Sequence, residues 1–423
     1  MEMALVMFVV LFLTLFLSTP IYVSLTLASM AAMHFFGDYS LSAVMQRIFG
    51  GMDKFALMSL PFYVLAAEIM TVGGMSRRII NFVNALMGSF RGSLAVATQG
   101  ACMFFGALSG SSPATVMAIG SIMYPKMNES GYPKAFSAGL ITSSGAVAIL
   151  VPPSITFIIY GATTGVSISS LFLGGIGAGL VFGVPIMLYS YYYAIVHNVP
   201  VPPKASIKEI WHITKDALWS LGVPVIIVGG ITGGIFTPTE AAGVSVLYAL
   251  LVCVLVYREM SLTGLYDALI SSAVTIGQLM ILLGTAALFG WTLAVSFFPQ
   301  MLTAKMVEVI SSKYLILFIV NIIFLVAGMF IDGGAAIMIL VPLVFLPLLR
   351  MGIDPVHLGV ILVTNLAVGM YTPPFGLNIF VARSVTHLPL TEIYRAVIPF
   401  ILISFFALAI VTYVPAVALF FVR

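Results

Sequence analysis

Two stretches of this sequence decide its fold: Leu150-Val-Pro-Pro-Ser-Ile-Thr156 and Tyr371-Thr-Pro-Pro-Phe-Gly-Leu-Asn378. Each places a Pro-Pro pair inside a segment that is otherwise apolar enough for a membrane-spanning helix. Proline lacks the backbone N–H of a helical residue and its ring clashes with the preceding turn, so a helix cannot run regularly through either pair. The two stretches therefore predict two broken helices, with Pro152 and Pro373 lying 221 positions apart.

Other landmarks recur at nearly the same distance along the chain. Offsets of 218 to 222 positions join Pro20 to Pro238, Pro125 to Pro347 and Gly131 to Gly352. A near-constant offset indicates two copies of one unit. We predict a first repeat at 1–197, a linker at 198–217 and a second repeat at 218–423. Because each unit has an odd number of expected crossings, the second copy is inverted.

Composition places this chain in a lipid bilayer. Of its 423 residues, 61% are hydrophobic and 7% are charged, whereas a soluble domain has about 25% charged residues. Segments of roughly 20 apolar residues, the length of a spanning helix, recur throughout. The sequence therefore predicts an all-α polytopic membrane protein with about ten transmembrane helices. The net charge of +3 forms no basic patch, which excludes nucleic acid as a partner.

Two pairs of short apolar runs predict re-entrant hairpins. The first pair, 93–108 and 113–124, is joined by Ser109-Gly-Ser-Ser-Pro113, and the second occupies 314–346 with its tip at Gly328 to Gly334. Interfacial segments are expected near 76–91 and around Lys305, Glu308 and Lys313. The basic residues Arg77, Arg78, Arg91, Lys126 and Lys134 flank the first hairpin, so the positive-inside rule places that side and the linker in the cytoplasm and both termini outside.

Broken helices at matched positions of inverted repeats are a pointer to a transport site, because irregular backbone at membrane depth must face protein or a polar cavity. At the first hairpin tip, a serine cap before Pro113 makes a helix start that attracts anions. The carbonyls that end the preceding half-helix favour a cation. Hairpin and break in each half are expected to clamp one ion, which predicts at least two sodium sites with the substrate between them.

These considerations assign candidate ligands to three groups. The first sodium site is expected at Gly106, Ser109, Ser112, Gly145, Ala148, Val151 and Pro152. The second is expected at Gly328, Asp332, Gly369 and Thr372. The substrate is expected to contact Ser111, Pro113, Thr115, Ser154 and Asn378. No catalytic residue, organic cofactor or metal other than sodium is expected.

Simpler interpretations stay open for these residues. Small residues also serve helix packing in membranes, Asp332 can cap its own helix, and Glu240 suits a helix start. Glu68 lies within a span with no evident partner. An intramembrane serine hydrolase would need a base beside the hairpin serines, and no histidine lies there. A channel or structural scaffold is a further alternative. The absence of a GxxxxGK[ST] motif argues against nucleotide hydrolysis.

Four motifs in order resemble the large (M) membrane subunit of tripartite ATP-independent periplasmic (TRAP) transporters. They are Gly106-Ala-Leu-Ser-Gly-Ser-Ser-Pro-Ala-Thr115, Leu150 to Thr156, Gly234-Ile-Phe-Thr-Pro-Thr-Glu-Ala-Ala242 and Tyr371 to Asn378. The match covers essentially the whole chain. One departure is Ile331-Asp-Gly-Gly-Ala-Ala336, where the family more often has Thr or Pro after the acid.

The resemblance implies a sodium-driven elevator in the bacterial inner membrane. A transport domain, about 76–169 and 298–395, would slide against a scaffold, about 1–75 and 170–297. The resemblance also implies a small (Q-type) membrane subunit and a periplasmic (P-type) substrate-binding protein that delivers a carboxylated solute. Sialic acid (N-acetylneuraminate) is the leading expectation, with C4-dicarboxylates or other sugar acids as the alternative.

Overall fold

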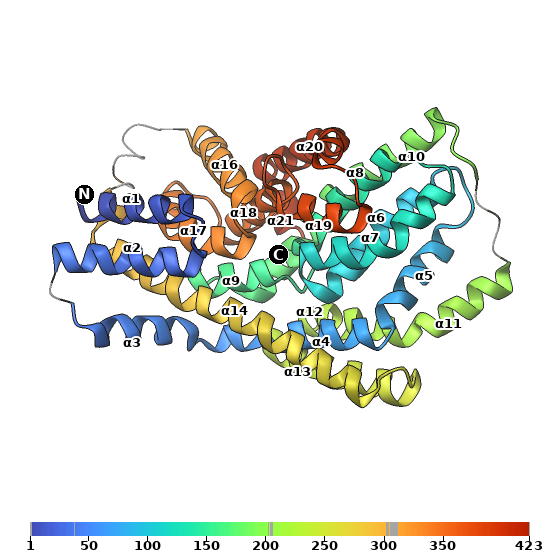
Figure 1. Cartoon of the computed structure of the whole chain (residues 1–423), viewed down its shortest axis with the longest axis horizontal. Coiled ribbons are helices and arrows are strands. Elements are labelled where there is room, and N and C mark those ends of the chain that lie inside the picture. Colours follow the sequence, from blue (N-terminus) through green and yellow to red (C-terminus); the bar gives the residue numbers. More distant parts are fainter. Residues whose placement is uncertain are drawn as a thin grey trace.

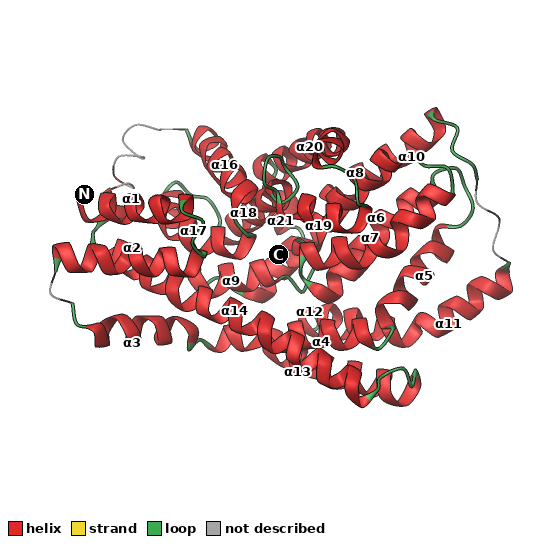
Figure 2. Cartoon of the chain, in the orientation of Figure 1, coloured by secondary structure: helices red, strands yellow, loops and turns green. Residues whose placement is uncertain are grey.

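The computed structural model describes residues 2–37, 39–201, 203, 206–301, 304 and 312–422. In this part of the chain every regular element is a helix (Figure 2). The helices form one elongated body, and many of them run along its long axis (Figure 1). Eight described helices are long and apolar enough to cross a membrane, and six shorter apolar helices accompany them. The predicted all-α, multi-pass architecture is confirmed.

The first part of the chain begins at the left end of the body in Figure 1 and continues through its lower half. Its helices are α1 (Glu2–Phe16), α2 (Ile21–Phe36), α3 (Leu41–Met52), the 3₁₀ turn η1 (Phe55–Met58), α4 (Ser59–Val72) and α5 (Met75–Met87). Pro20 occupies the N-cap position of α2. The apolar run from residue 3 to 36 is too long for one crossing, and it forms two helices that are separated just before Pro20.

The first hairpin and the first broken helix follow as predicted. Their elements are α6 (Ser93–Ser109), α7 (Ser112–Glu129), α8 (Lys134–Ser144), the 3₁₀ turn η2 (Gly145–Ile149), α9 (Ile155–Thr164) and the long α10 (Ile168–Val196). Helix α7 is longer than the apolar run 113–124, because it continues through Pro125 to Glu129. Helix ends at η2 and restarts at Ile155, on either side of the Pro-Pro pair.

The second repeat opens with longer helices than the sequence suggested. They are α11 (Ile207–Pro224), the π-helical turn η3 (Val225–Gly229), α12 (Gly230–Thr232), α13 (Pro238–Leu251), the π-helical turn η4 (Val252–Val256) and α14 (Leu262–Val295). The first of them begins at Ile207, inside the stretch 198–217 that was predicted as linker. Ser206 and Glu209 form a capping box there, which starts the helix in polar sequence.

The second hairpin and broken helix match the first in order. They are α16 (Lys313–Phe330), α17 (Gly333–Arg350), α18 (Pro355–Gly369) and α19 (Leu377–Thr386), followed by α20 (Leu390–Tyr413) and α21 (Pro415–Leu419). Of the interfacial segment expected before this hairpin, Lys305 and Glu308 lie outside the described residues, and Lys313 is the first residue of α16.

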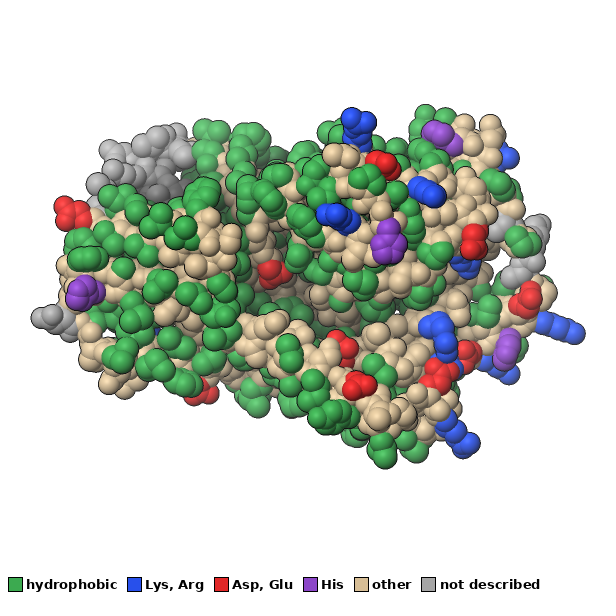
Figure 3. All heavy atoms as spheres, in the orientation of Figure 1, with side chains coloured by type: hydrophobic (Ala, Val, Ile, Leu, Met, Phe, Trp, Pro, Cys, Tyr) green, Lys and Arg blue, Asp and Glu red, His purple; other side chains and the backbone are tan. Residues whose placement is uncertain are grey.

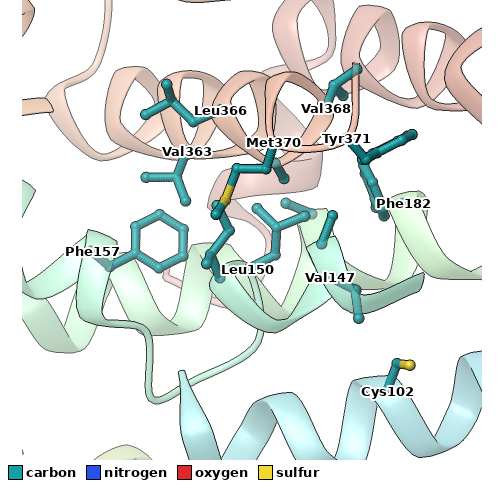
Figure 4. Close-up of a cluster of buried hydrophobic side chains, with 14 of the residues drawn as sticks. Cys102, Val147, Leu150, Phe157, Phe182, Val363, Leu366, Val368, Met370 and Tyr371 are labelled. Carbon is teal, nitrogen blue, oxygen red and sulfur yellow. The ribbon is translucent and has the colours of Figure 1, made fainter. Parts of the chain in front are cut away.

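The two broken helices pack against each other in the core. Figure 4 shows Leu150 and Phe157, from either side of the first break, close to Val363, Leu366 and Met370 of the second broken helix. All five side chains are buried. The interrupted segments therefore lie inside the protein, where their neighbours rather than lipid surround the irregular backbone.

An ionic cluster ties α5 to α11 and to the loop before α14. Arg78 contacts Asp216 at 2.9 Å and Glu259 at 2.8 Å, and its guanidinium lies 3.7 Å from the ring centre of Tyr257. Arg77 also reaches Glu259, at 3.0 Å. The hydrogen bond from Arg78 lowers the pKa of Glu259 below its usual value.

Candidate functional site

The first arm of each hairpin touches the broken helix of its own half. A methyl group built on Gly106 would lie 2.6 Å from Cα of Ala148, and one built on Gly369 would lie 2.8 Å from Cα of Gly328. The two pairs occupy matching positions, with Gly328 following Gly106 by 222 residues and Gly369 following Ala148 by 221. Backbones this close require residues without bulky side chains. Predicted ligands of each sodium site therefore meet within their own half.

The second arm of each hairpin instead packs on the restarted helix of the other half. Helix α7 contacts α19, and α17 contacts α9. Ser112 Oγ donates to Asn378 Oδ1 at 2.9 Å, and Asn378 Nδ2 donates to the Thr142 carbonyl at 3.1 Å. On the matching side, a methyl group on Gly333 would lie 3.6 Å from Thr156 Oγ1. Each hairpin therefore contacts the broken helices of both halves.

A cavity of about 290 Å³ lies where these parts meet. The first hairpin tip, residues 109–114, lines it together with Asp332 and Gly334 of the second tip and with Thr156 at the start of α9. Helices α4 and α14 form the wall opposite, and Ile149, Ile155 and Met370 of the broken helices complete the lining. Figure 3 shows a hollow near the centre of the drawn face, with an acidic group inside it. The cavity lies between the segments predicted to move and those predicted to stay fixed.

The cavity gathers some of the predicted substrate contacts and leaves others aside. Ser111 and Pro113 line it, at the start of α7. Thr115 is buried and bonds the Ser111 carbonyl at 2.8 Å. Ser154 is also buried, where it caps α9 by accepting from the Phe157 amide at 3.2 Å. Asn378 is the buried bridge to Ser112. Thr115, Ser154 and Asn378 therefore do not line the cavity, and their side chains instead bond neighbouring parts of the protein.

The residues expected at the first sodium site divide into three locations. Ser109 and Ser112 line the cavity. The closely packed residues Gly106, Gly145 and Ala148 are buried, Gly145 against Val116 of α7. Val151 and Pro152 lie on the far side of the break, Val151 against Gly179 of α10 and Pro152 in an apolar crevice beside α12. The structure does not bring Val151 and Pro152 to the cavity.

The residues expected at the second sodium site include two oxygen-bearing side chains. Asp332 lines the cavity, and its Oδ2 accepts from the Gly334 amide at 2.9 Å. The simpler role expected for Asp332, capping its own helix, is therefore present. Thr372 is 7% exposed and donates to the Val368 carbonyl at 2.7 Å. Its hydroxyl oxygen still has lone pairs that can face a cation.

Glu68 is a cavity residue to which the sequence assigned no role. It lies on α4, lines the cavity, and accepts a hydrogen bond from Ser271 Oγ at 3.2 Å. The only sequence feature that could have indicated this position was the presence of an acidic residue inside a predicted membrane span. Glu240, by contrast, has the structural place expected of it, because it forms a capping box with Thr237 at the start of α13.

Paired hairpins and paired broken helices that surround a central cavity define a membrane permease. The family described as "Tripartite ATP-independent periplasmic transporter, DctM component" matches residues 8–417. The chain belongs to this family, so it is a TRAP large permease and not an enzyme. The predicted place in the membrane, a multi-pass protein of the bacterial inner membrane, is confirmed as well.

Several curated proteins resemble the chain over most of its length. The C4-dicarboxylate TRAP transporter large permease protein DctM of Pseudomonas aeruginosa is 42% identical, covering 94% of this chain and 93% of that protein. The ectoine/5-hydroxyectoine TRAP transporter large permease protein UehC of Ruegeria pomeroyi is 40% identical, covering 99% and 98%. The isethionate TRAP transporter permease protein DctMQ of Oleidesulfovibrio alaskensis is 40% identical; the match covers 96% of this chain but only 64% of that protein.

A solved structure shares the fold at low sequence identity. The Alcanivorax borkumensis YdaH transporter, whose structure is described as having an unusual topology, aligns with a TM-score of 0.59. The alignment covers 88% of each chain at 13% identity. This likeness concerns the fold alone.

Proposed function

We propose that this chain is the large permease of a sodium-coupled, binding-protein-dependent secondary transporter that imports a carboxylated solute. The observation that carries the proposal is the cavity at the amino-terminal end of α7. Ser111 and Ser112 line it there, and Pro113 occupies the first turn of this 18-residue helix. Free amides and the helix dipole at such an end attract a carboxylate.

Sodium ions are the proposed co-substrates, held on either side of this cavity. Each half brings a hairpin and a broken helix into backbone contact, at Gly106 with Ala148 and at Gly328 with Gly369. Helix α6 ends near one contact and α18 near the other, and helix ends present carbonyl oxygens. Asp332 and Thr372 add side-chain oxygens in the second half. Oxygen donors of this kind suit a hard cation.

Movement of the hairpins against the scaffold is the proposed transport step. The cavity has one wall from the hairpin tips and the other from α4 and α14, so sliding these walls past each other would change the access to the cavity. One further contact crosses the same boundary, where Lys54 Nζ donates to the Ala162 carbonyl at 2.7 Å.

The proposed partners are a small Q-type membrane subunit and a soluble P-type binding protein. The names of the relatives support the first, because they separate a "large permease" from the fused permease DctMQ. The same names specify C4-dicarboxylates, ectoine, isethionate and 2,3-diketo-L-gulonate as solutes of those proteins. N-acetylneuraminate shares the carboxylate of several of these solutes, and it remains the lead among sugar acids.

Reconstitution tests the proposal directly. The chain, its small subunit and its binding protein are placed in liposomes, and uptake of each labelled candidate solute is measured with an inward sodium gradient and with a potassium gradient. We expect uptake of one solute class only with sodium and only with the binding protein. If uptake is equal with the sodium gradient and with the potassium gradient, the coupling is refuted. Uptake without a binding protein indicates a channel.

A matched pair of variants links the result to the cavity. Asp332→Asn removes the charge of the cavity acid but keeps its size, and we expect a higher sodium concentration for half-maximal uptake. Asp267→Asn makes the same change on the exposed surface of α14 and should leave the sodium response unaltered. Equal sodium responses in the two variants would remove Asp332 from the proposed site.

A further inference from the structure

A second cavity, of about 500 Å³, lies away from the transport cavity and shares no lining residue with it. It is bounded by α5, the beginning of α6, the end of α7 and the beginning of α11. One part of its wall is polar, with Asn84, Ser93 and Lys126, and another is apolar, with Ile210 and Ile213. Among the described lining residues there is no Asp or Glu.

The amino-terminal end of α6 opens into this cavity. The helix has 17 residues, begins at Ser93 and has Gly92 as its N-cap, a residue that offers no side-chain cap. Ser93 and Leu94 both line the cavity. The Ser93 amide donates to the Phe90 carbonyl at 3.0 Å, and the helix dipole favours an anion at this end. Lys126, which makes no ion pair among the described residues, adds a full positive charge.

Two polar side chains lining the cavity lack partners that a ligand would supply. Ser93 is only 2% exposed, yet its hydroxyl takes part in no hydrogen bond within the described part of the chain. Asn84 has its Oδ1 buried without a donor, while its Nδ2 reaches only the sulfur of Met123 at 3.6 Å. Buried polar groups are nearly always hydrogen-bonded. An acceptor anion would satisfy Ser93, and a donor would satisfy Asn84.

We propose that this cavity binds a membrane phospholipid whose headgroup carries a hydrogen-bond donor, such as phosphatidylethanolamine or phosphatidylglycerol. The phosphate lies between Ser93, the first turn of α6 and Lys126, and the ammonium or hydroxyl of the headgroup reaches Asn84. An acyl chain follows Ile210 and Ile213. A basic pocket between helices with an apolar side is the form expected for a phospholipid site. This site is independent of the proposed sodium coupling and of the imported solute.

Native mass spectrometry of the purified full-length chain tests the proposal, with phosphatidylethanolamine, phosphatidylglycerol, phosphatidylcholine or inorganic phosphate added in turn. Phosphatidylcholine keeps the phosphate but has no headgroup donor. We expect the first two lipids to bind, and phosphatidylcholine to bind more weakly. Inorganic phosphate that binds as tightly as either lipid would show a free-anion site and overturn the lipid assignment. Equal binding of all three lipids would overturn the donor requirement at Asn84.

Matched variants locate the bound lipid. Ser93→Ala and Lys126→Ala should each weaken lipid binding about tenfold, because each removes a hydrogen bond to a charged group. Ser121→Ala and Lys134→Ala make the same changes at exposed positions on α7 and α8 and should bind as the natural chain does. Lipid binding that is unchanged in both cavity variants, or reduced equally in the controls, would overturn the site.

Discussion

Gly106→Ala is expected to force the first hairpin away from the first broken helix. The new methyl carbon would lie 2.6 Å from Cα and 2.9 Å from Cβ of Ala148, atoms that no side-chain rotation can move aside. Carbon atoms pack at about 3.5–4.0 Å, so α6 and η2 must separate by about 1 Å. Over-packing of this kind costs about 1–3 kcal/mol. The same separation moves the helix end at which we place the first sodium ion.

The measurement is thermal unfolding of the purified chain across a sodium titration. We expect a lower midpoint for Gly106→Ala and a smaller rise of that midpoint with sodium. The control is Gly277→Ala in the interior of α14, where a methyl group meets nothing within 4 Å. Alanine is preferred to glycine in a helix by about 1 kcal/mol, so this control should be neutral or stabilised. If both variants give the same midpoint and sodium response, the close packing at Gly106 does not matter and our reasoning is refuted.

Three further substitutions test neighbouring features. Ser112→Ala leaves Oδ1 of Asn378 buried without its donor, which should cost about 1–3 kcal/mol of stability and raise the sodium concentration for half-maximal uptake. Thr372→Ala should weaken the sodium dependence more than the stability; unchanged sodium titrations in both variants would show that neither hydroxyl is a sodium ligand. Arg78→Ala should lower stability by about 1 kcal/mol at neutral pH. Because Arg78 lowers the pKa of Glu259, this stabilisation is present at neutral pH and is lost as the pH falls below the usual value of 4.5. The stability of the variant should therefore fall less than that of the natural chain over the same acid range.

Local chemistry explains why much of this architecture was predictable. The prolines at 152 and 373 cannot continue a helix, whatever surrounds them, so both breaks follow from the chain alone. The hairpin tips were predictable in the same way, because Pro113 suits the first turn of a helix and Asp332 suits a cap. The serine cap expected before Pro113 does not form: Ser111 is the N-cap but its side chain makes no cap bond, and the Ser112 hydroxyl bonds Asn378. The start of α11 was misplaced because its capping box lies in polar sequence, where hydropathy gives no signal.

Only the tertiary structure decided which of these local elements meet. Ser112 and Asn378 are 266 positions apart, and their hydrogen bond depends on how the inverted halves dock. Likewise, nothing local indicates that Glu68 faces the cavity or that Pro152 faces away from it. A helix break follows from the covalent chemistry of its own residues, whereas a binding site needs surfaces from distant segments. The sequence by itself therefore determined where the helices stop, and the packing of the two halves decided which of those stops form the cavity.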